Sequence, residues 1–436
     1  MENESNSIVL NRSLLKTSFG NRFSHVATIT GHFAPCFSVT FDKSENRIIT
    51  GSDDGSVKIW CSQTGILIHS LLGHEAAVSD ISCSPNNLIL ASCSLDGSAR
   101  FWHMQTGQHL SCIMHSSSFH SVQFHPILSS NGIGQVCLSS SDGFVYIWQF
   151  KMVISSGKND ISLTILPSVR KFLCRTAIRH GIQCCTFTQG GFRIIVGSTD
   201  GFIRMIRTDC EHNVTTNKNL SIGPPDFNLF EQHEGNVSSV HCSYRDGRFV
   251  TGSWDGTARI WSFDKVSLLW TSQQLDVYRD GPKFQANPDA DQRNKVLLVL
   301  WSIDDTKVIT SSDDCCIRVW NVLTGELMFR LPLHTDLVYI LAGHPKIDSL
   351  ILSAGWDGRI ALWDITTGKL VASFMYEGRK FNDGQFNNDG TLFVLVDERG
   401  SLLIFSMGLT REAYSQAPVE QFFPVDFGHV TYDGGN

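Results

Sequence analysis

The stretch "GSDDGSVKIW", residues 51–60, decides the fold. Its Asp-Gly pair at 54–55 stands between two apolar runs, and Trp60 ends the second run. Asp-Gly is a preferred pair for two-residue β-hairpin turns, because such turns need residues that accept positive φ. The stretch therefore predicts a hairpin, which is either a local feature or one copy of a larger repeat.

The pattern recurs along the chain as a small residue, Ser, any residue, Asp and Gly, with Trp six positions after the Asp. Five further copies are "CSLDGSARFW" (to Trp102), "SSSDGFVYIW" (to Trp148), "GSWDGTARIW" (to Trp261), "SSDDCCIRVW" (to Trp320) and "AGWDGRIALW" (to Trp363). Two copies without the Trp keep the frame and end at Ile206 and Phe405. The shortest spacings fall within the period of about 40–45 residues typical of four-stranded propeller blades. Eight copies predict an all-β, eight-bladed β-propeller, with seven blades as the alternative if the copy around Arg399 is misread.

Ring closure needs one more strand, because the last copy supplies only three, near 380–386, 391–396 and 401–406. We expect "SHVATIT" at 24–30 to be the fourth strand of the last blade, which would leave no open sheet edge. The predicted domain limits are therefore an N-terminal extension at 1–23, a propeller at 24–407 and a C-terminal extension at 408–436. Polar insertions are expected around 153–170 and 276–294.

A His precedes most of the turns, with His180 as a poorer candidate in the fourth copy. With these residues the chain resembles the WD-repeat family of β-propellers over residues 25–406. The resemblance implies that the His, the Ser two before the Asp, the Asp and the Trp form a buried hydrogen-bonded tetrad in each blade. The complete sets are His32, Ser52, Asp54 and Trp60; His74, Ser94, Asp96 and Trp102; His115, Ser140, Asp142 and Trp148; and His233, Ser253, Asp255 and Trp261. The partial sets are Ser312, Asp314 and Trp320 in blade six, and His334, Asp357 and Trp363 in blade seven, where Gly355 stands in place of the Ser.

The same residue types also occur in hydrolase triads. A catalytic group is needed once, whereas this set recurs in several blades, and a buried carboxylate needs such hydrogen-bond partners to be tolerated. We therefore expect a structural role and no enzyme activity. The Gly-rich stretch at 129–136 lacks a phosphate-binding spacing, and His115 and His120 lack metal-type partners, so no cofactor or metal is expected.

Composition restricts the partners. The formal net charge of -7 and pI near 6.1 argue against direct nucleic-acid binding, which usually needs a basic surface. The apolar run "VLLVLW" at 296–301 has the length of a strand, so no membrane segment is expected. The 13 Cys residues have no metal-type spacing and are interpreted as reduced, mostly buried thiols. The expected partners are proteins or peptides, bound by a monomer.

The candidate binding residues stand just before the turn aspartates. Trp254 and Trp356 hold this position in blades five and seven, and Asp53, Asp313 and Glu398 hold it in other blades. The family resemblance implies that the position lies on the narrower top face around the channel. An aromatic and acidic mouth would suit a peptide that carries Lys or Arg. Alternatively, each Trp folds over a neighbouring blade.

Longer stretches resemble the propeller of the bromodomain and WD-repeat proteins: "CFSVTFDKSENRIITGSDDGSVKIW", "FVTGSWDGTARIW", "LVYILAGHPKIDSLILSAGWDGRIALWD" and "EQFFPVDF" at 420–427. The resemblance implies a nuclear, chromatin-associated role in transcription regulation, with the cytoplasm as the alternative location. It also implies histone tails as partners and a substrate-receptor role in a cullin-4 RING ubiquitin ligase. Its adaptor-docking motif would use Ile351, Leu352, Asp357, Trp363 and Asp364, with Thr366 at the position where that motif has Arg. The alternative function is a generic scaffold in signalling, cytoskeletal or RNP assembly.

Overall fold

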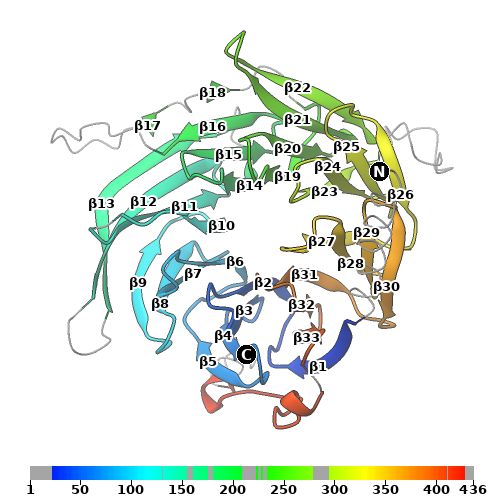
Figure 1. Cartoon of the computed structure of the whole chain (residues 1–436). Helices are drawn as coiled ribbons and strands as arrows, with labels where there is room; N and C mark the ends of the chain where they lie inside the picture. The colour runs from blue at the N-terminus through cyan, green and yellow to red at the C-terminus, as the bar shows by residue number, and fades with distance from the viewer. Residues whose placement is uncertain are drawn as a thin grey trace, which may run out of the picture.

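The computed structural model describes residues 22–129, 131–154, 161–174, 180–208, 222–223, 227–228, 233–277, 294–409 and 411–427. Eight sheets of mainly antiparallel strands stand around a central axis, as Figure 1 shows. The predicted eight-bladed propeller is therefore confirmed. Two short 3-10 helices, η2 (Arg411–Tyr414) and η3 (Pro424–Asp426), follow the last strand.

The first four blades take their strands in chain order, from the channel outwards. Blade one holds β2 (Cys36–Phe41), β3 (Arg47–Ser52), β4 (Val57–Cys61) and β5 (Leu67–Leu71). Blade two holds β6 (Val78–Cys83), β7 (Ile89–Ser94), β8 (Ser98–His103) and β9 (His109–Met114). Blade three holds β10 (Phe119–Phe124), β11 (Ile133–Ser140), β12 (Phe144–Ile154), β13 (Ile161–Leu173) and the short parallel β17 (Ile222–Gly223). Blade four holds β14 (Ile182–Phe187), β15 (Arg193–Ser198), β16 (Ile203–Arg207) and β18 (Phe227–Asn228).

The remaining blades follow the same plan. Blade five holds β19 (Val237–Cys242), β20 (Phe249–Ser253), β21 (Thr257–Asp264) and β22 (Leu269–Asp276). Blade six holds β23 (Val296–Trp301), β24 (Lys307–Ser312), β25 (Ile317–Asn321) and β26 (Leu327–Leu331). Blade seven holds β27 (Val338–Gly343), β28 (Leu350–Gly355), β29 (Arg359–Asp364) and β30 (Lys369–Met375). Blade eight holds β31 (Phe381–Phe386), β32 (Leu392–Asp397) and β33 (Ser401–Ser406).

Blade eight is completed by β1 (Ser24–Thr30), which pairs antiparallel with β33. The predicted closing strand at 24–30 is therefore confirmed. Because the first strand of the chain belongs to the last blade, the two ends of the ring are joined by a full strand pair. Within this strand pair the register shifts once, between His25 and Ala27.

The core lies between blades, because each sheet is covered on both faces by its neighbours. The middle strands β7, β28, β32 and β33 are accordingly buried along their whole length. Strands buried on both faces need near-continuous apolar or small residues, without the alternation of a half-exposed strand. This packing explains why the strand segments between the Asp-Gly turns consist mainly of apolar and small residues.

The expected insertion at 153–170 takes a different form in the described residues. The hairpin of β12 and β13 continues outwards, pairing Lys151 with Thr164 and Ile154 with Ile161. The described residues of the insertion thus lengthen blade three as paired strands. Residues 155–160, and 278–293 within the second predicted insertion, lie outside the described residues.

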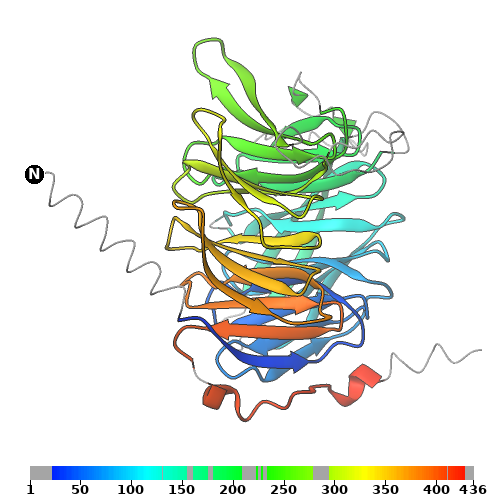
Figure 2. The same cartoon turned by 90° about the vertical axis from the view of Figure 1, so that its right-hand side faces the viewer.

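The segment after the last strand packs on the ring. Residues 411–427 run along the outer rim where blade eight meets blade one, as Figure 2 shows from the side. Tyr414, Gln421 and Asp426 are buried there. This part of the predicted C-terminal extension is therefore attached to the propeller. Among the described residues, no helix has the length and apolar character needed to cross a membrane.

Candidate functional site

A hydrogen-bonded tetrad closes blade one. Nδ1 of His32 lies 3.1 Å from Oδ2 of Asp54, and its Nε2 lies 2.7 Å from Oγ1 of Thr50. The indole Nε1 of Trp60 donates to the same Thr50 oxygen at 3.0 Å. We letter the four strands of each blade A to D from the channel outwards. The loop before β2 is thereby tied to the turn between strands B and C (the B–C turn) and, through the hydroxyl, to strand C.

The same arrangement holds in blades two, five and seven, with the hydroxyl supplied by Ser92, Thr251 and Ser353. Blade seven, which was expected to lack its hydroxyl because of Gly355, is complete. The assignment of the hydroxyl to the Ser two before the Asp is therefore wrong by two residues.

The physical reason is visible in blade one. Ser52 lies at the strand end beside the turn, where its Oγ donates to Ala34 O and accepts from the N–H of Asp54. Thr50 lies two residues deeper on the same strand face, within reach of the indole. The same correction applies to Ser94 and Ser253.

Blade three does not form the expected tetrad. Leu138 occupies the hydroxyl position, and the buried Nε1 of Trp148 has no hydrogen-bond partner. Tyr146 takes over, since its hydroxyl donates to Oδ2 of Asp142 at 2.9 Å and lies 2.9 Å from Nε2 of His115. This finding corrects the predicted set of His115, Ser140, Asp142 and Trp148.

Arginine holds the turn aspartate in blades four and six. Arg204 makes two hydrogen bonds to Asp200, and Arg318 makes two to Asp314. In blade six Ser312 also donates to Asp314 at 2.6 Å, while Trp320 keeps its bond to Thr310. A bidentate guanidinium thus replaces the imidazole as the partner of the carboxylate.

The tetrad carboxylates are held in the charged form. Burial alone would raise the pKa of Asp54, Asp96 and Asp255, but hydrogen bonds from the His and from the residue after the turn Gly hold each pKa well below its usual range. A carboxylate with so low a pKa and so many donors is a poor proton acceptor. The geometry fits a structural fastener, and no group of residues that could hold a metal ion occurs in the described part of the chain.

The B–C turns present one ring of equivalent side chains. In every blade the N–H of the residue before the turn Asp, or before Arg399 in blade eight, donates to a loop carbonyl at 2.9 to 3.0 Å. This bond fixes the same backbone position eight times. The ring members are Asp53, Leu95, Ser141, Thr199, Trp254, Asp313, Trp356 and Glu398.

A second ring comes from β-bulges, because the second residue of every innermost strand falls in a register shift. Its members are Phe37, Ser79, His120, Gln183, Ser238, Leu297, Tyr339 and Asn382. A bulge re-aims its side chain and often marks a functional edge. Sequence analysis missed this ring, and its signal would have been the second position of each inner strand.

The two rings meet at Trp356. Its ring centroid lies 4.8 Å from that of Tyr339, and its Nε1 donates to Asn382 at 3.3 Å. Nζ of Lys380 lies 4.9 Å from the Trp356 ring and also pairs with Glu398 at 3.6 Å. Trp356 is thereby held between three residues of its own and the next blade.

Trp254 shows the same relation to its neighbour. Nζ of Lys295, at the start of blade six, lies 4.9 Å from its ring. The Trp254 side chain is nevertheless 42% exposed. Each Trp thus contacts a lysine of the following blade, and Trp254 keeps much of its surface open to solvent.

The aromatic and acidic ring members occupy consecutive blades. We call Trp254, Asp313, Trp356, Glu398 and Asp53 the top-face arc; it runs from blade five through blade eight to blade one. Burial raises the pKa of Asp53 and Asp313, with the neighbouring turn aspartate adding to the effect. The opposite blades present Leu95, Ser141 and Thr199 at the same positions.

The residues matched to the adaptor-docking motif lie inside blade seven. Ile351, Leu352, Asp357, Trp363 and Asp364 have side chains with almost no exposed surface. Asp357 belongs to the tetrad, and Asp364 accepts bonds from the N–H of Thr366 and the hydroxyl of Thr367. Of this motif only Thr366 is exposed, so the matched side chains themselves do not form a contact surface.

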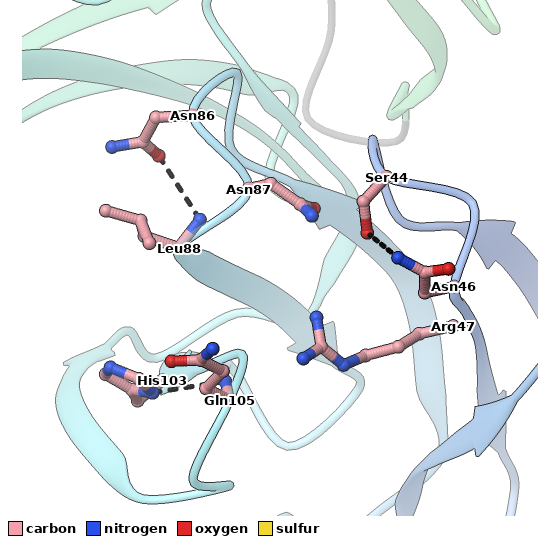
Figure 3. A pocket seen from close by; sticks show the side chains of 8 residues that line it. All are labelled: Ser44, Asn46, Arg47, Asn86, Asn87, Leu88, His103 and Gln105. Atoms are coloured by element: carbon pink, nitrogen blue, oxygen red, sulfur yellow. Dashed lines mark hydrogen bonds between the residues drawn. The ribbon is translucent and has the colours of Figure 1, made fainter. Parts of the chain in front are cut away.

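A small polar pocket of about 300 Å³ lies away from the arc, between the A–B turns of blades one and two (Figure 3). Some lining side chains bond within their own turns, as Ser44 with Asn46 and Asn86 with the N–H of Leu88. Asn87 bonds across the two blades to Asp42. The remaining lining residues are Arg47, Asn87, His103 and Gln105. Since Arg47 and Asn87 already bond to Asp42, and His103 accepts the N–H of Gln105, we assign no ligand to the pocket.

Comparison with known proteins agrees with this architecture. The family model described as WD domain, G-beta repeat matches residues 23–61, 65–103, 227–262, 291–321 and 325–364. A bromodomain and WD repeat-containing protein of Dictyostelium discoideum is 28% identical over 97% of this chain and 21% of its own length. The guanine nucleotide-binding protein subunit beta of Arabidopsis thaliana is 25% identical over 77% of this chain and 82% of its own length.

Two further matches are more distant. Apoptotic protease-activating factor 1 of Homo sapiens is 23% identical over 87% of this chain and 30% of its own length. The chain thus spans 21% of the length of the Dictyostelium relative and 30% of the length of the human one. The designed Ika8 protein has a TM-score of 0.63 at 22% identity, covering 88% of this chain and 99% of that one, which shows the fold alone.

Proposed function

Since this chain is an eight-bladed β-propeller that carries WD40 repeats, we propose that it is a non-catalytic protein-interaction scaffold whose top-face arc binds a basic peptide segment. The observation that carries the proposal is the asymmetry of the pre-turn ring. All eight positions have the same backbone hydrogen bond, so the fold itself requires no Trp or carboxylate there. Two Trp and three acidic residues nevertheless gather on consecutive blades.

The chemistry of the arc fits a peptide that carries Lys or Arg. Trp buries much area at low entropic cost and is enriched at interface hot spots. The intramolecular lysines over Trp254 and Trp356 show that both rings accept a cation on one face. Asp53 and Asp313 would pair with further basic side chains, and a peptide cation would compete with Lys380 for Glu398.

A role in chromatin regulation is the finer proposal. It is supported by the similarity to a bromodomain and WD repeat-containing protein, and histone tails are basic peptides of the kind the arc would suit. That role would place the protein in the nucleus. A substrate-receptor role with a cullin-4 adaptor would need a contact surface other than the buried blade-seven residues. The alternative is a scaffold outside chromatin, as the similarity to G-protein β subunits allows.

The experiment compares the arc with the same positions across the ring. We expect W254A/W356A and D53N/D313N/E398Q to lose capture of basic histone-tail peptides on an array, while S141A/T199A keeps it. Affinity purification with mass spectrometry on the same variants would identify cellular partners. Equal capture by arc and control variants would contradict the arc as the binding site. Recovery of partners without histones or the cullin-4 adaptor would favour the alternative scaffold.

A further inference from the structure

Residues 411–427, which we call the latch, cross the full depth of the seam between blades eight and one (Figure 2). At the beginning of the latch, Tyr414 is buried and its hydroxyl donates to Ser62 O in the C–D turn of blade one. Gly65 in the same turn lies so close that an added Cβ would meet the Tyr414 ring at 2.8 Å. Ile29 of β1 lies equally close, so the turn packs against both side chains because residue 65 has none of its own.

The middle of the latch joins the two blades. The backbone N–H of Gln421 donates to Thr30 O at 2.9 Å, and the N–H of Thr30 donates to Val419 O at 2.7 Å. The side chain of Gln421 turns to the other blade, where Oε1 accepts from the N–H of Leu67 at 2.7 Å and Nε2 donates to Gly65 O at 2.9 Å. One residue thus bonds β1 of blade eight and the outer strand of blade one.

The end of the latch neutralises a buried charge. Nζ of Lys58 lies 2.6 Å from Oδ2 of Asp426, and both side chains are almost fully buried. Ser70 Oγ donates to the other carboxylate oxygen, and the N–H of Phe423 donates to Oδ2. Asp426 is the only carboxylate paired with Lys58 among the described residues.

Comparison of blades explains this dependence. Lys58 stands four residues after the turn aspartate, where Arg204 and Arg318 bond their own Asp. In blade one that aspartate, Asp54, is held by His32 and Ser56. Lys58 therefore pairs with Asp426 of the latch instead of with the turn aspartate, since a buried ammonium needs a partner.

Aromatic rings of the latch contact blade one beside the ion pair. Phe422 stacks on Phe33 with centroids 4.3 Å apart, and Phe427 meets Phe33 edge-on at 5.6 Å. Lys58 Nζ lies 4.7 Å from the Phe422 ring. The outer edge of blade one thus presents three binding groups to the latch: backbone groups that bond a side-chain amide, an aromatic ring, and an ammonium that pairs with a carboxylate.

We propose that the outer edge of blade one is a peptide-binding groove that recognises a Gln-Phe-Phe-x-x-Asp sequence, filled in cis by Gln421–Asp426. The bound sequence fastens the seam at which the ring closes. This inference rests on the fold and is independent of the top-face arc, so failure of either leaves the other standing.

The test separates the latch from the ring after folding. A specific protease site is inserted between Leu409 and Arg411, and the folded full chain is cut there. We expect the cut segment to stay with the ring during size-exclusion chromatography and to exchange with a labelled synthetic peptide of residues 411–428. The D426A peptide should bind at least about tenfold more weakly, because the buried Lys58 loses its partner. The matched control is the V425A peptide, since Val425 is exposed.

Variants of the intact chain provide a second measurement. D426A should lower the melting temperature clearly, V425A should not, and adding K58M to D426A should recover part of the loss by removing the unpaired charge. If D426A does not fold, K58M/D426L takes its place, and we expect it to fold. Equal binding of the D426A and V425A peptides, or release of the cut segment with an unchanged melting temperature, would overturn the proposal.

Discussion

Two sets of aspartates lie in the same propeller with pKa values shifted in opposite directions. The tetrad aspartates, such as Asp96, have a pKa well below the usual range, whereas burial raises the pKa of Asp80 and Asp383 on the innermost strands to about 6. In both sets burial favours the neutral acid. The partners make the difference, because Asp96 is bonded by His74 as well as by backbone, whereas Asp80 and Asp383 have no cationic partner within the described part of the chain.

The channel carboxylates nevertheless have a structural task. Asp383 accepts the N–H of Val39 from blade one, and Asp80 accepts the N–H of Val122 from blade three. Gln385 and Gln123 serve the N–H groups of Phe41 and Phe187 in the same way. Inner strands are open edges facing the channel, so these side chains satisfy backbone donors that no strand can reach. An uncharged acceptor would perform this task equally well.

The largest expected effect is at a tetrad. Asp96→Ala should lower the free energy of unfolding by roughly 1–3 kcal/mol, because His74, Ser98 and the N–H of Glu75 lose a buried acceptor. Chemical denaturation at neutral pH would measure it. A cost near zero would mean that the tetrad does not stabilise the blade.

Substitution of a channel aspartate should change the free energy of unfolding in the opposite direction. The folded-state pKa of Asp383 is raised from 3.8 to about 6, so its contribution to the free energy of unfolding falls as pH rises from about 4 to 6 and stays low above that. Asp383→Asn keeps an acceptor for Val39 and should stabilise the protein by on the order of 1 kcal/mol at pH 7.5, after discounting for its partial exposure. The gain should shrink towards zero at pH 4. Unfolding curves at several pH values would show it, and a loss at pH 7.5 would contradict the comparison.

Asp96→Asn provides the matching pH control. The folded-state pKa of Asp96 is depressed, so its contribution is present above the unfolded-state pKa and is lost as pH falls below it. The difference between wild type and D96N should therefore narrow on acidification below about pH 4. The two Asn variants should thus have opposite signs at neutral pH. If both variants changed the free energy of unfolding in the same direction, burial rather than the hydrogen-bond partners would determine the effect at both sites.

The smallest effect is expected in blade three. Asp142→Ala should cost less than about 1 kcal/mol, since the side chain is partly exposed and Tyr146 keeps His115 as a partner. Parallel denaturation of D96A and D142A would rank the two blades. A cost for D142A as large as for D96A would show that the Tyr146 arrangement is a full substitute for the tetrad.

Prediction from the sequence succeeded where the signal is local. Asp-Gly turns, the following Trp and the apolar runs gave the blade count, and the missing strand of the last copy gave closure by residues 24–30. It failed where two neighbouring residues could each have made the same hydrogen bond. Thr50 and Ser52 are both hydroxyl residues on one strand face, and only the depth of the indole in the blade selects Thr50. The bulge ring and the Trp–Lys contacts were also missed. They depend on strand register and on the distance between blades, and the sequence pattern predicts neither.

The sequence by itself determined the number of blades and the way the ring closes, because each hairpin is specified by residues within about ten positions of its turn. The tertiary structure decided which distant groups meet. Lys58 and Asp426 are 368 positions apart, and neither residue indicates the other in the sequence. They become partners only when the closed ring brings the last segment against blade one, since a buried ammonium is stable there only with a carboxylate beside it.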